Sequence, residues 1–225
     1  MRVVIIGLGG IGTALTEFMC RYINYKEELN PRQMMLVDGD TYELKNMRRQ
    51  IFKEFGNKAE IKADELELRF RDIEFDVYPS YVNQENIGDV IRENDMVMLC
   101  VDNHKTRKIV NDYCSTCNNV TLISGGNDWI DGNTQLYIRK DGADITPSLT
   151  AYHPEIANPA DKSPEELSCE ELSTSAPQLF FTNAVAAVYM CLMFYNVVNS
   201  DKVPASEVYF DIELMSALSK VREVR

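Results

Sequence analysis

The chain has 225 residues, of which 45% are hydrophobic and 26% charged, a composition that excludes a wholly disordered chain. Its formal net charge of -12 argues against nucleic-acid binding and against binding to an anionic membrane, because both need neutralising cations. Any phosphate ligand must therefore be held by a local site against the overall field. The six cysteines form no dense disulfide framework, and the first apolar run is cut by glycines without a cleavage signature. We expect a reducing, cytoplasmic setting.

The first half of the chain alternates short apolar runs with segments of helical periodicity. Runs typical of buried strands lie at 3–6, 34–37, 74–78, 95–101 and 120–124. Helical spacing recurs at 11–25, 58–71 and 104–117. This alternation predicts a Rossmann-like, doubly wound α/β fold with a mainly parallel sheet and right-handed crossovers.

The pattern changes after Gly125. Residues 133–139 alternate like an antiparallel strand, and 207–212 predict a last strand, so antiparallel strands are expected on the C-terminal side of the sheet. Residues 141–177 hold five of the eight prolines. They predict an irregular crossover excursion within a single domain that spans 1–225.

Residues 178–198 are almost wholly apolar, which raises the alternative of a membrane span. Polar residues limit the uninterrupted apolar run to the twelve residues from Ala184 to Tyr195. A span needs about 20 apolar residues. The sequence therefore favours a core helix, and we expect no membrane partner.

A glycine-rich turn joins the first predicted strand to the first predicted helix. It reads GLGGIG, which fits G-x-G-x-x-G and offers Gly7, Gly9, Gly10 and Gly12 as candidate nucleotide-binding residues. Glycines are needed because the turn is tight and the backbone must approach a phosphate closely, while the helix N-terminus supplies free N–H groups. Asp38 ends the second strand, where Rossmann proteins bind ribose hydroxyls. These features serve NAD and ATP equally, and a tight turn without a ligand is the plain alternative.

The next segment separates the two nucleotides. NMRRQ at 46–50 places Arg49 close to the predicted phosphate position, and Lys58 adds a point charge. The N–H donors of an arginine guanidinium can bind the oxygens of a triphosphate and stabilise the charge that develops when pyrophosphate leaves. Asp102 ends another strand at the same edge of the sheet, where a carboxylate can hold Mg²⁺. Each of these residues alone could be a surface or helix-capping group. Their convergence on one edge of the sheet favours ATP over NAD.

Taken together, the motifs resemble the ThiF/MoeB-type adenylation domain of the ubiquitin-activating enzyme superfamily. The match runs in order through GLGGIG, DGD, KNMRRQ, GNKA, CVDN and SGG. The ending VYFDIELMSALSKVRE is similar to the closing strand and helix of the family. The segment 177–183 is similar to the short ThiF-like proteins of PRTRC gene clusters.

This resemblance implies an ATP-dependent adenylyltransferase. A carboxylate oxygen would attack the α-phosphate of ATP and give an acyl-adenylate and pyrophosphate, with positioning and electrostatics doing most of the work. The implied substrate is the C-terminus of a small ubiquitin-like or sulfur-carrier-like protein, and the implied assembly is a homodimer. Catalytic roles fall on Arg49, Lys58 and Asp102, with Asp102 also holding Mg²⁺. Besides the glycines, the implied nucleotide-binding residues are Asp38, Asp40, Asn46, Arg49, Lys58, Asp102 and Asn103.

Three features depart from the family pattern. The family often has an N-terminal helix that supplies an arginine to the partner subunit's site, and we expect that arginine to be missing or replaced, since this sequence starts on the first strand. The common zinc site uses two CxxC pairs, whereas this chain has only Cys114-x-x-Cys117, so we expect no zinc. Arg49 and Lys58 also lie slightly closer together than is usual.

Family members often pass the acyl group to a cysteine on the crossover. Cys169 lies in the corresponding excursion and is the candidate nucleophile, although its acidic neighbours disfavour the thiolate. A structural or incidental thiol is the alternative.

Two other functions stay open. An NAD(P)-dependent oxidoreductase would use the same glycine-rich turn, but it leaves NMRRQ and Lys58 without a role, and no proton-transfer pair stands out. A catalytically lapsed module would keep the nucleotide as a structural ligand or lose it, because a fold does not fix a function.

Overall fold

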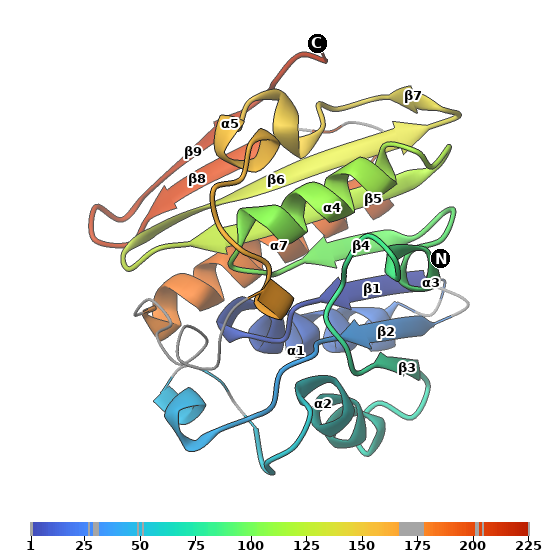
Figure 1. The fold of residues 1–225 in the computed structure, drawn as a ribbon, viewed down its shortest axis with the longest axis vertical. Helices are drawn as coiled ribbons and strands as arrows, with labels where there is room; N and C mark the ends of the chain where they lie inside the picture. Colours follow the sequence, from blue (N-terminus) through green and yellow to red (C-terminus); the bar gives the residue numbers. More distant parts are fainter. Residues whose placement is uncertain are drawn as a thin grey trace.

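The computed structural model describes residues 2–26, 28, 32–48, 50, 52–166, 178–200, 203 and 205–224. All of the described strands join one sheet in the order β3-β2-β1-β4-β5-β6-β8-β9, with β7 beside β6 (Figure 1). The strands are β1 (Arg2–Ile6), β2 (Gln33–Val37), β3 (Glu74–Tyr78), β4 (Met96–Leu99), β5 (Val120–Asn127), β6 (Asp131–Lys140), β7 (Ala143–Asp144), β8 (Glu207–Asp211) and β9 (Ser216–Lys220).

The sheet has a parallel part and an antiparallel part. Strands β3, β2, β1, β4 and β5 pair in parallel, and every pair from β5 through β6 and β8 to β9 is antiparallel. The predicted mainly parallel Rossmann-like sheet with antiparallel strands on its C-terminal side is therefore confirmed. The closing helix that the resemblance implied is instead strand β9, which forms a hairpin with β8. Met215, with φ of 50°, lies in the turn that joins them.

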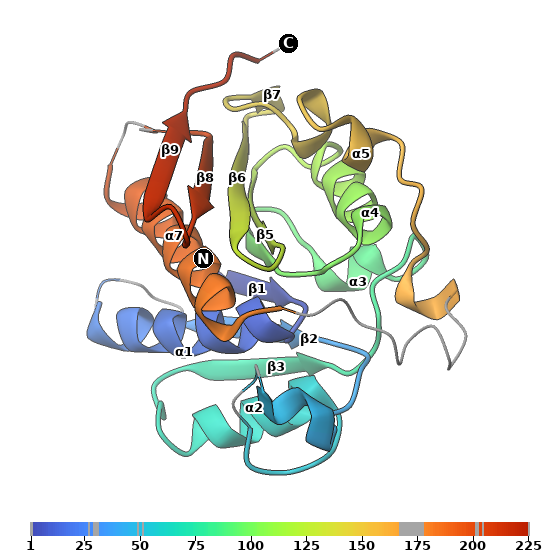
Figure 2. The same cartoon turned by 90° about the vertical axis from the view of Figure 1, so that its left-hand side faces the viewer.

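Helices cover both faces of the sheet (Figure 2). One face carries α1 (Gly10–Tyr25), α2 (Lys58–Glu67) and α7 (Phe180–Asn199), and the other carries α3 (Ile87–Val90), α4 (His104–Cys114) and α5 (Pro154–Ala157). Short 3-10 turns lie at η1 (Leu44–Arg48), η2 (Leu149–Ala151) and η3 (Pro164–Glu166).

Strand β1 shows why the first apolar run is continuous. Val3 and Ile5 face the core under α1 and α7, while Val4 and Ile6 face the core under α4. A strand covered by helices on both sides buries every residue, and β1 is buried throughout.

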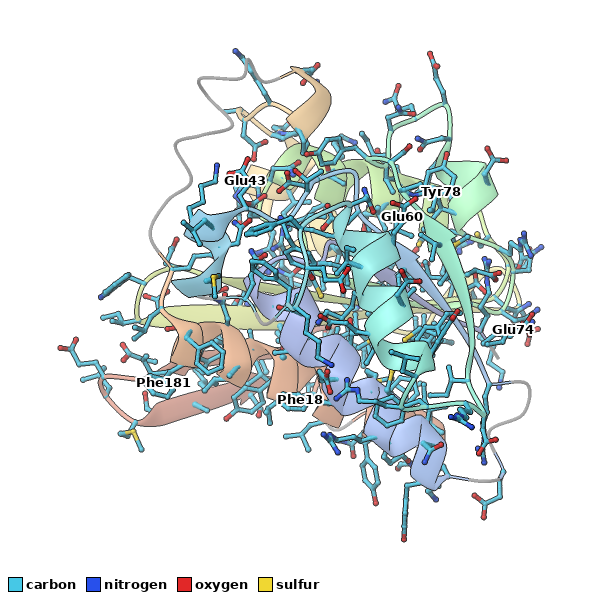
Figure 3. The ribbon with its side chains drawn as sticks, turned by 90° about the horizontal axis from the view of Figure 1, so that it is seen from below. Phe18, Glu43, Glu60, Glu74, Tyr78 and Phe181 are labelled. Atoms are coloured by element: carbon cyan, nitrogen blue, oxygen red, sulfur yellow. The ribbon has the colours of Figure 1, made fainter. Side chains whose placement is uncertain are left out.

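Helix α7 packs against α1 and against strands β5 and β6. Met190 and Phe194 are buried in that contact, whereas Phe181 and Tyr195 are exposed at 66% and 49%. Figure 3, which shows the molecule from below, labels Phe181 at the start of α7. The helix is long and apolar enough to cross a membrane by length and composition, and 39% of its most apolar stretch is buried. Only one side of α7 therefore packs into the core, and the other side is exposed.

Two of the contacts that tie the described part of the crossover, 141–166, to the rest of the molecule lie at His153 and Asp161. The His153 ring nitrogens form hydrogen bonds with the carboxylates of Glu155 and Glu207 at 2.9 and 2.8 Å, and the bond to Glu207 joins the crossover to β8. Asp161 accepts the backbone N–H groups of His104 and Lys105 at 2.6 and 3.1 Å. The crossover is therefore fixed across the N-terminus of α4, close to the end of β4.

Candidate functional site

A cavity of about 1310 Å³ opens where the parallel strands end. Its floor includes Ile6, Val37 and Cys100, which end or follow β1, β2 and β4. From β1 the chain proceeds through β2 and β3 to one side, and β4 and β5 lie on the other, so the strand order reverses between β1 and β4. Ligands of open α/β sheets bind at such a switch point. The cavity therefore lies at the place that the topology favours.

The four glycines of the turn have different structural roles. Gly7 has a φ of +90°, and a Cβ on Gly12 would lie 1.9 Å from the Gly7 carbonyl oxygen, so both are required by the turn itself. A Cβ on Gly10 would lie 2.2 Å from the amide nitrogen of buried Asn183 on α7. At Gly9 a Cβ would meet nothing within 4 Å. Gly7, Gly9 and Gly10 line the cavity, and Gly9 is the one that leaves open space for a ligand.

These roles separate ligand binding from stability. Gly9→Ala is expected to keep the melting temperature and to weaken ATP binding by about tenfold, because its methyl group fills the space that a phosphate would occupy. Gly12→Ala is expected to cost about 2–4 kcal/mol of unfolding free energy, because its Cβ collides with backbone. Thermal melts of both variants measure the change in stability, and calorimetric ATP titrations of both variants measure the change in affinity. Equal ATP affinity in wild type and Gly9→Ala would contradict the assignment of the phosphate position.

Asp38 links the end of β2 to the glycine turn. Its two carboxylate oxygens accept the N–H of Leu8 at 2.5 Å and of Asp40 at 2.8 Å. Burial raises the pKa of Asp38, and the nearby Lys58 ammonium opposes that shift. Asp38 lines the cavity and is 8% exposed. It can meet a ribose hydroxyl only through its remaining lone pairs, while it also orders the turn.

Lys58 begins helix α2 with its side chain in the cavity wall. It is 5% exposed, and its Nζ lies 2.5 Å from the Asp40 carboxylate. The preceding Asn57 caps the helix by accepting the N–H groups of Ala59 and Glu60, and its amide donates to the Asp38 carbonyl at 2.9 Å. The GNKA motif is thus a helix cap that fixes a buried ammonium group beside the β2 turn. Sequence reasoning missed Asn57, although an asparagine before a predicted helix is a capping signal.

Asn46 also lines the cavity. The Asn46 side-chain oxygen accepts the N–H of Glu43 at 2.8 Å, and the residue is 5% exposed. Arg49 and the candidate nucleophile Cys169 lie outside the described residues. Their proposed roles stay predictions.

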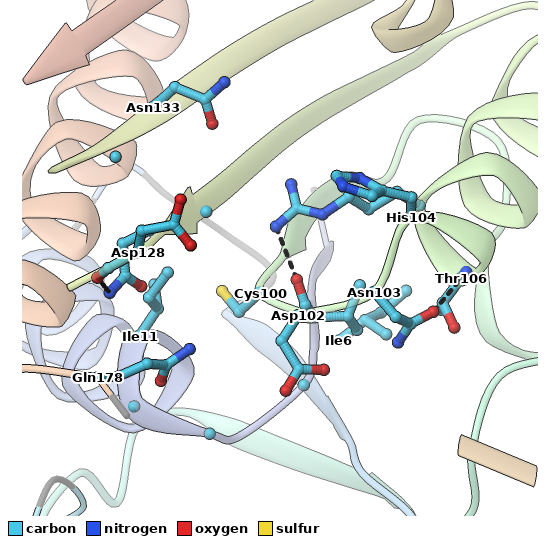
Figure 4. Close-up of a pocket in the computed structure, with 18 of the residues that line it drawn as sticks. Ile6, Ile11, Cys100, Asp102, Asn103, His104, Thr106, Asp128, Asn133 and Gln178 are labelled. Atoms are coloured by element: carbon cyan, nitrogen blue, oxygen red, sulfur yellow. Dashed lines mark hydrogen bonds between the residues drawn. The ribbon is translucent and has the colours of Figure 1, made fainter. Parts of the chain in front are cut away.

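Asp102 is exposed and projects toward the middle of the cavity (Figure 4). Within the described ranges its carboxylate has no hydrogen bond or ion pair. Asn103, the next residue, caps α4 by accepting the N–H of Thr106 at 2.8 Å. A capping role for Asn103 leaves Asp102 free for a ligand.

Arg107 is a cavity residue that sequence reasoning missed. Its guanidinium donates to the Ser124 hydroxyl at 2.7 Å and to the carbonyl oxygens of Val101 and Gly125 at 2.7 and 2.8 Å. Burial lowers its pKa. These bonds tie the ends of β4 and β5 together and fix the backbone that carries Asp102. The available signal was its place in the buried stripe of α4, three residues before Val110, where a charge is out of pattern.

Metal-ligating side chains do not cluster in threes within the described residues. No group of three His, Cys, Asp or Glu side chains in the described residues has the geometry to hold a metal ion. Cys114 and Cys117 are buried in the core, and burial raises the pKa of both thiols. A magnesium ion at Asp102 would therefore need phosphate and water oxygens to complete its shell, as is usual for Mg²⁺.

The fold and the cavity define the chain as a Rossmann-like α/β protein with a glycine turn at its topological switch point. The profile of the ThiF family matches residues 1–225, and the chain belongs to this family. The ThiF/MoeB resemblance seen in the motifs is confirmed.

Relatives with similar sequences are adenylyltransferases by name. The molybdopterin-synthase adenylyltransferase of Escherichia coli (strain K12) is 25% identical over 191 residues, which are 83% of this chain and 70% of that protein. The adenylyltransferase and sulfurtransferase MOCS3 of Drosophila virilis is 27% identical over 139 residues, 60% of this chain and 29% of that protein. This chain therefore spans less than a third of the MOCS3 relative.

A similar fold occurs in the crystal structure of E. coli MccB with ATP. The TM-score is 0.75 at 19% identity, over 98% of this chain and 63% of the MccB chain. MccB has also been crystallised with MccA, with a TM-score of 0.73 at 19% identity, over 99% of this chain and 65% of that chain. At this identity the likeness establishes the fold.

Proposed function

We propose that the protein is an ATP-dependent adenylyltransferase that activates the C-terminal carboxylate of a small protein or peptide. The observation that carries the proposal is the convergence of three groups on one cavity. Three separate segments contribute to the same space: the N-terminus of α1 at Gly9, the buried Lys58 ammonium, and the Asp102 carboxylate, which has no partner among the described residues.

The residues present fit a triphosphate. The open side of Gly9 admits a phosphate to the free N–H groups of the first α1 turn, where the helix dipole favours negative charge. Lys58 would exchange its contact with Asp40 for phosphate oxygens. Mg²⁺ bound to Asp102 would neutralise charge on the phosphates. Asp38 and Asn46 also line the cavity, and Asp38 joins the glycine turn to the Lys58 region, where a ribose would lie.

The reaction needs positioning rather than acid–base chemistry. A carboxylate oxygen of the substrate forms a bond to the α-phosphorus, the bond to the bridging oxygen breaks, and pyrophosphate leaves with the electron pair. No proton transfer is required, because the attacking carboxylate is already ionised at neutral pH. The chain supplies charge and orientation, which is how phosphoryl-group chemistry is usually catalysed.

The names of the relatives support the substrate class. One relative is a molybdopterin-synthase adenylyltransferase, and MccB has been crystallised with MccA. For this chain we propose a small ubiquitin-like or sulfur-carrier-like protein, and a homodimer as the active assembly.

The decisive assay is ATP–pyrophosphate exchange with candidate small proteins that end in Gly-Gly. Exchange should require Mg²⁺ and a partner with a free C-terminal carboxylate, and an amidated C-terminus should abolish it. ATP binding without partner-dependent exchange would indicate a lapsed module. Preferential binding of NAD over ATP would overturn the proposal in favour of an oxidoreductase.

A further inference from the structure

A cluster of charged side chains lies where the crossover meets the antiparallel part of the sheet. His153 precedes helix α5, Glu207 begins strand β8, and Arg222 lies in the segment that follows β9. His153 is 7% exposed and Glu207 is 5% exposed. Ionisable groups are rarely buried unless they are paired, and here three segments that are far apart in the sequence supply the pairs.

Both ring nitrogens of His153 face a carboxylate. Nε2 lies 2.8 Å from Oε1 of Glu207, and Nδ1 lies 2.9 Å from Oε1 of Glu155. A neutral imidazole has one N–H group and one bare nitrogen, so it could donate to only one carboxylate and would turn a lone pair toward the other. An imidazolium donates to both. The geometry therefore corresponds to a protonated His153.

Glu207 has further donors that do not depend on His153. Its Oε2 accepts hydrogen bonds from Nε–H of Arg222 at 2.8 Å and from the Tyr209 hydroxyl at 3.1 Å. Burial opposes the ionisation of Glu207, but these hydrogen bonds and the one from His153 lower its pKa. Loss of the His153 proton would leave Glu207 ionised and paired with Arg222. Only the bond from β8 to the crossover would be lost.

The balance of charge around His153 favours its protonated form. Burial opposes the charge, but hydrogen bonds to two carboxylates outweigh it and raise the pKa of His153 from its ordinary value of 6.5. The other titratable or charged groups described near this cluster are Tyr209 on β8, Arg222 beside Glu207, Tyr152 under the Arg222 guanidinium, and His104 and Arg107 on α4 near Glu155.

The segment that His153 holds is part of the cavity wall. Glu155 and Ile156 line the cavity, and helix α5 packs on α4 (Figure 2). The helix has four residues, of which Ile156 alone is buried. The charged contact with β8 therefore supplies an anchor that the small apolar face of α5 does not.

We propose that His153 is a proton-dependent latch, which fixes the start of the crossover to β8 when it is protonated and releases it when the proton is lost. The inference goes beyond the proposed function and does not depend on it, since it concerns a wall of the cavity and not the ligand inside. Histidine is the side chain whose ordinary pKa lies closest to physiological pH. The latch thus makes the hold on this wall respond to pH near neutrality.

The pH dependence has a definite direction. Below about pH 6.5, His153 is protonated in the folded and in the unfolded chain, and the latch contributes fully to stability. As the pH rises through the raised pKa of the folded protein, the proton is lost and this contribution disappears. Alkaline pH should therefore loosen the start of the crossover.

Proton NMR tests the protonation state directly, because the chain has only two histidines. His104→Gln leaves the ring signals of His153 alone, and their titration midpoint should lie above 6.5. Glu207→Gln should lower that midpoint by at least about one pH unit, because it removes a carboxylate that stabilises the imidazolium. A midpoint below the ordinary value, or one that Glu207→Gln leaves unchanged, would overturn the proposal.

Hydrogen–deuterium exchange tests the latch itself. The backbone amides of residues 149–158 are compared between the wild type and His153→Gln at the same pH, so that the pH dependence of intrinsic exchange cancels. At about pH 6 the wild type should exchange at least about tenfold more slowly, and the ratio should fall toward one by about pH 9. The glutamine keeps a donor for Glu207 but cannot carry the charge.

His104→Gln is the matched control, because it removes the other imidazole and leaves both carboxylates beside His153. It should exchange as the wild type does at both pH values. Equal exchange of wild type and His153→Gln at the lower pH, or a ratio that does not change with pH, would contradict the latch. If His153→Gln does not fold, the NMR midpoint of His153 still decides. Neither measurement involves pyrophosphate exchange, so the latch and the adenylation proposal fail separately.

Discussion

Replacing Asp102 with alanine is expected to lower partner-dependent ATP–pyrophosphate exchange by about a hundredfold. The structure gives this carboxylate no role in the fold, since it is exposed and without a partner in the described residues, while Asn103 caps the following helix. Its loss should therefore act on the reaction and leave the melting temperature unchanged. Initial exchange rates at saturating ATP measure the effect.

Asp112→Ala is the matched control for this variant. Asp112 lies on the helix that follows Asp102, and its ion pair with Lys108 is exposed to solvent. Exposed pairs contribute less than about 1 kcal/mol, so its exchange rate and stability should match the wild type. A wild-type rate for Asp102→Ala would remove Asp102 from the site.

Lys58→Met is expected to lower exchange by a similar factor and to raise the KM for ATP. The ammonium is buried in the cavity wall beside Asp40, and Asp38 lies behind it, so its removal leaves two carboxylates where the phosphates must bind. Electrostatic effects are large in such a desolvated place. Steady-state exchange kinetics over a range of ATP concentrations check both constants.

A second substitution distinguishes two roles for Lys58. If Lys58 only neutralises Asp40, then Asp40→Asn should restore activity to Lys58→Met. If Lys58 contacts the phosphates, the double variant should stay nearly as slow as the single one, and this is the result we expect. Lys108→Met, which removes an exposed ammonium from α4, should leave the kinetics unchanged.

The parallel core and the position of the cavity were predictable because they follow from local pattern. The glycine turn comes directly after a buried run, and Asp38, Lys58 and Asp102 each follow or begin an element at the carboxyl edge of the sheet. Parallel strands bring such positions together whatever the loops between them do. This is why three residues separated by 64 positions from first to last line one space.

The rest of the site depends on contacts between distant segments. Asn183 reads in the sequence as a polar break in an apolar run, yet its buried amide lies against Gly10 and explains why that position has no side chain. Arg107 binds the ends of two strands, one of them 18 residues away. Strand β9 reads SALSK, has four exposed residues out of five, and pairs with β8 alone among the described strands, so its hairpin depends on the edge of the sheet and not on local propensity.

A crystal structure with Mg²⁺ and a non-hydrolysable ATP analogue tests the central claim most directly. The account predicts the phosphates at the open side of Gly9 within hydrogen-bonding distance of the α1 N–H groups, with Lys58 turned from Asp40 onto a phosphate oxygen and Asp102 at the metal ion. The same structure would show whether Arg49 reaches the triphosphate. A nucleotide bound elsewhere, or one that leaves Lys58 on Asp40 and Asp102 in bulk solvent, would contradict it.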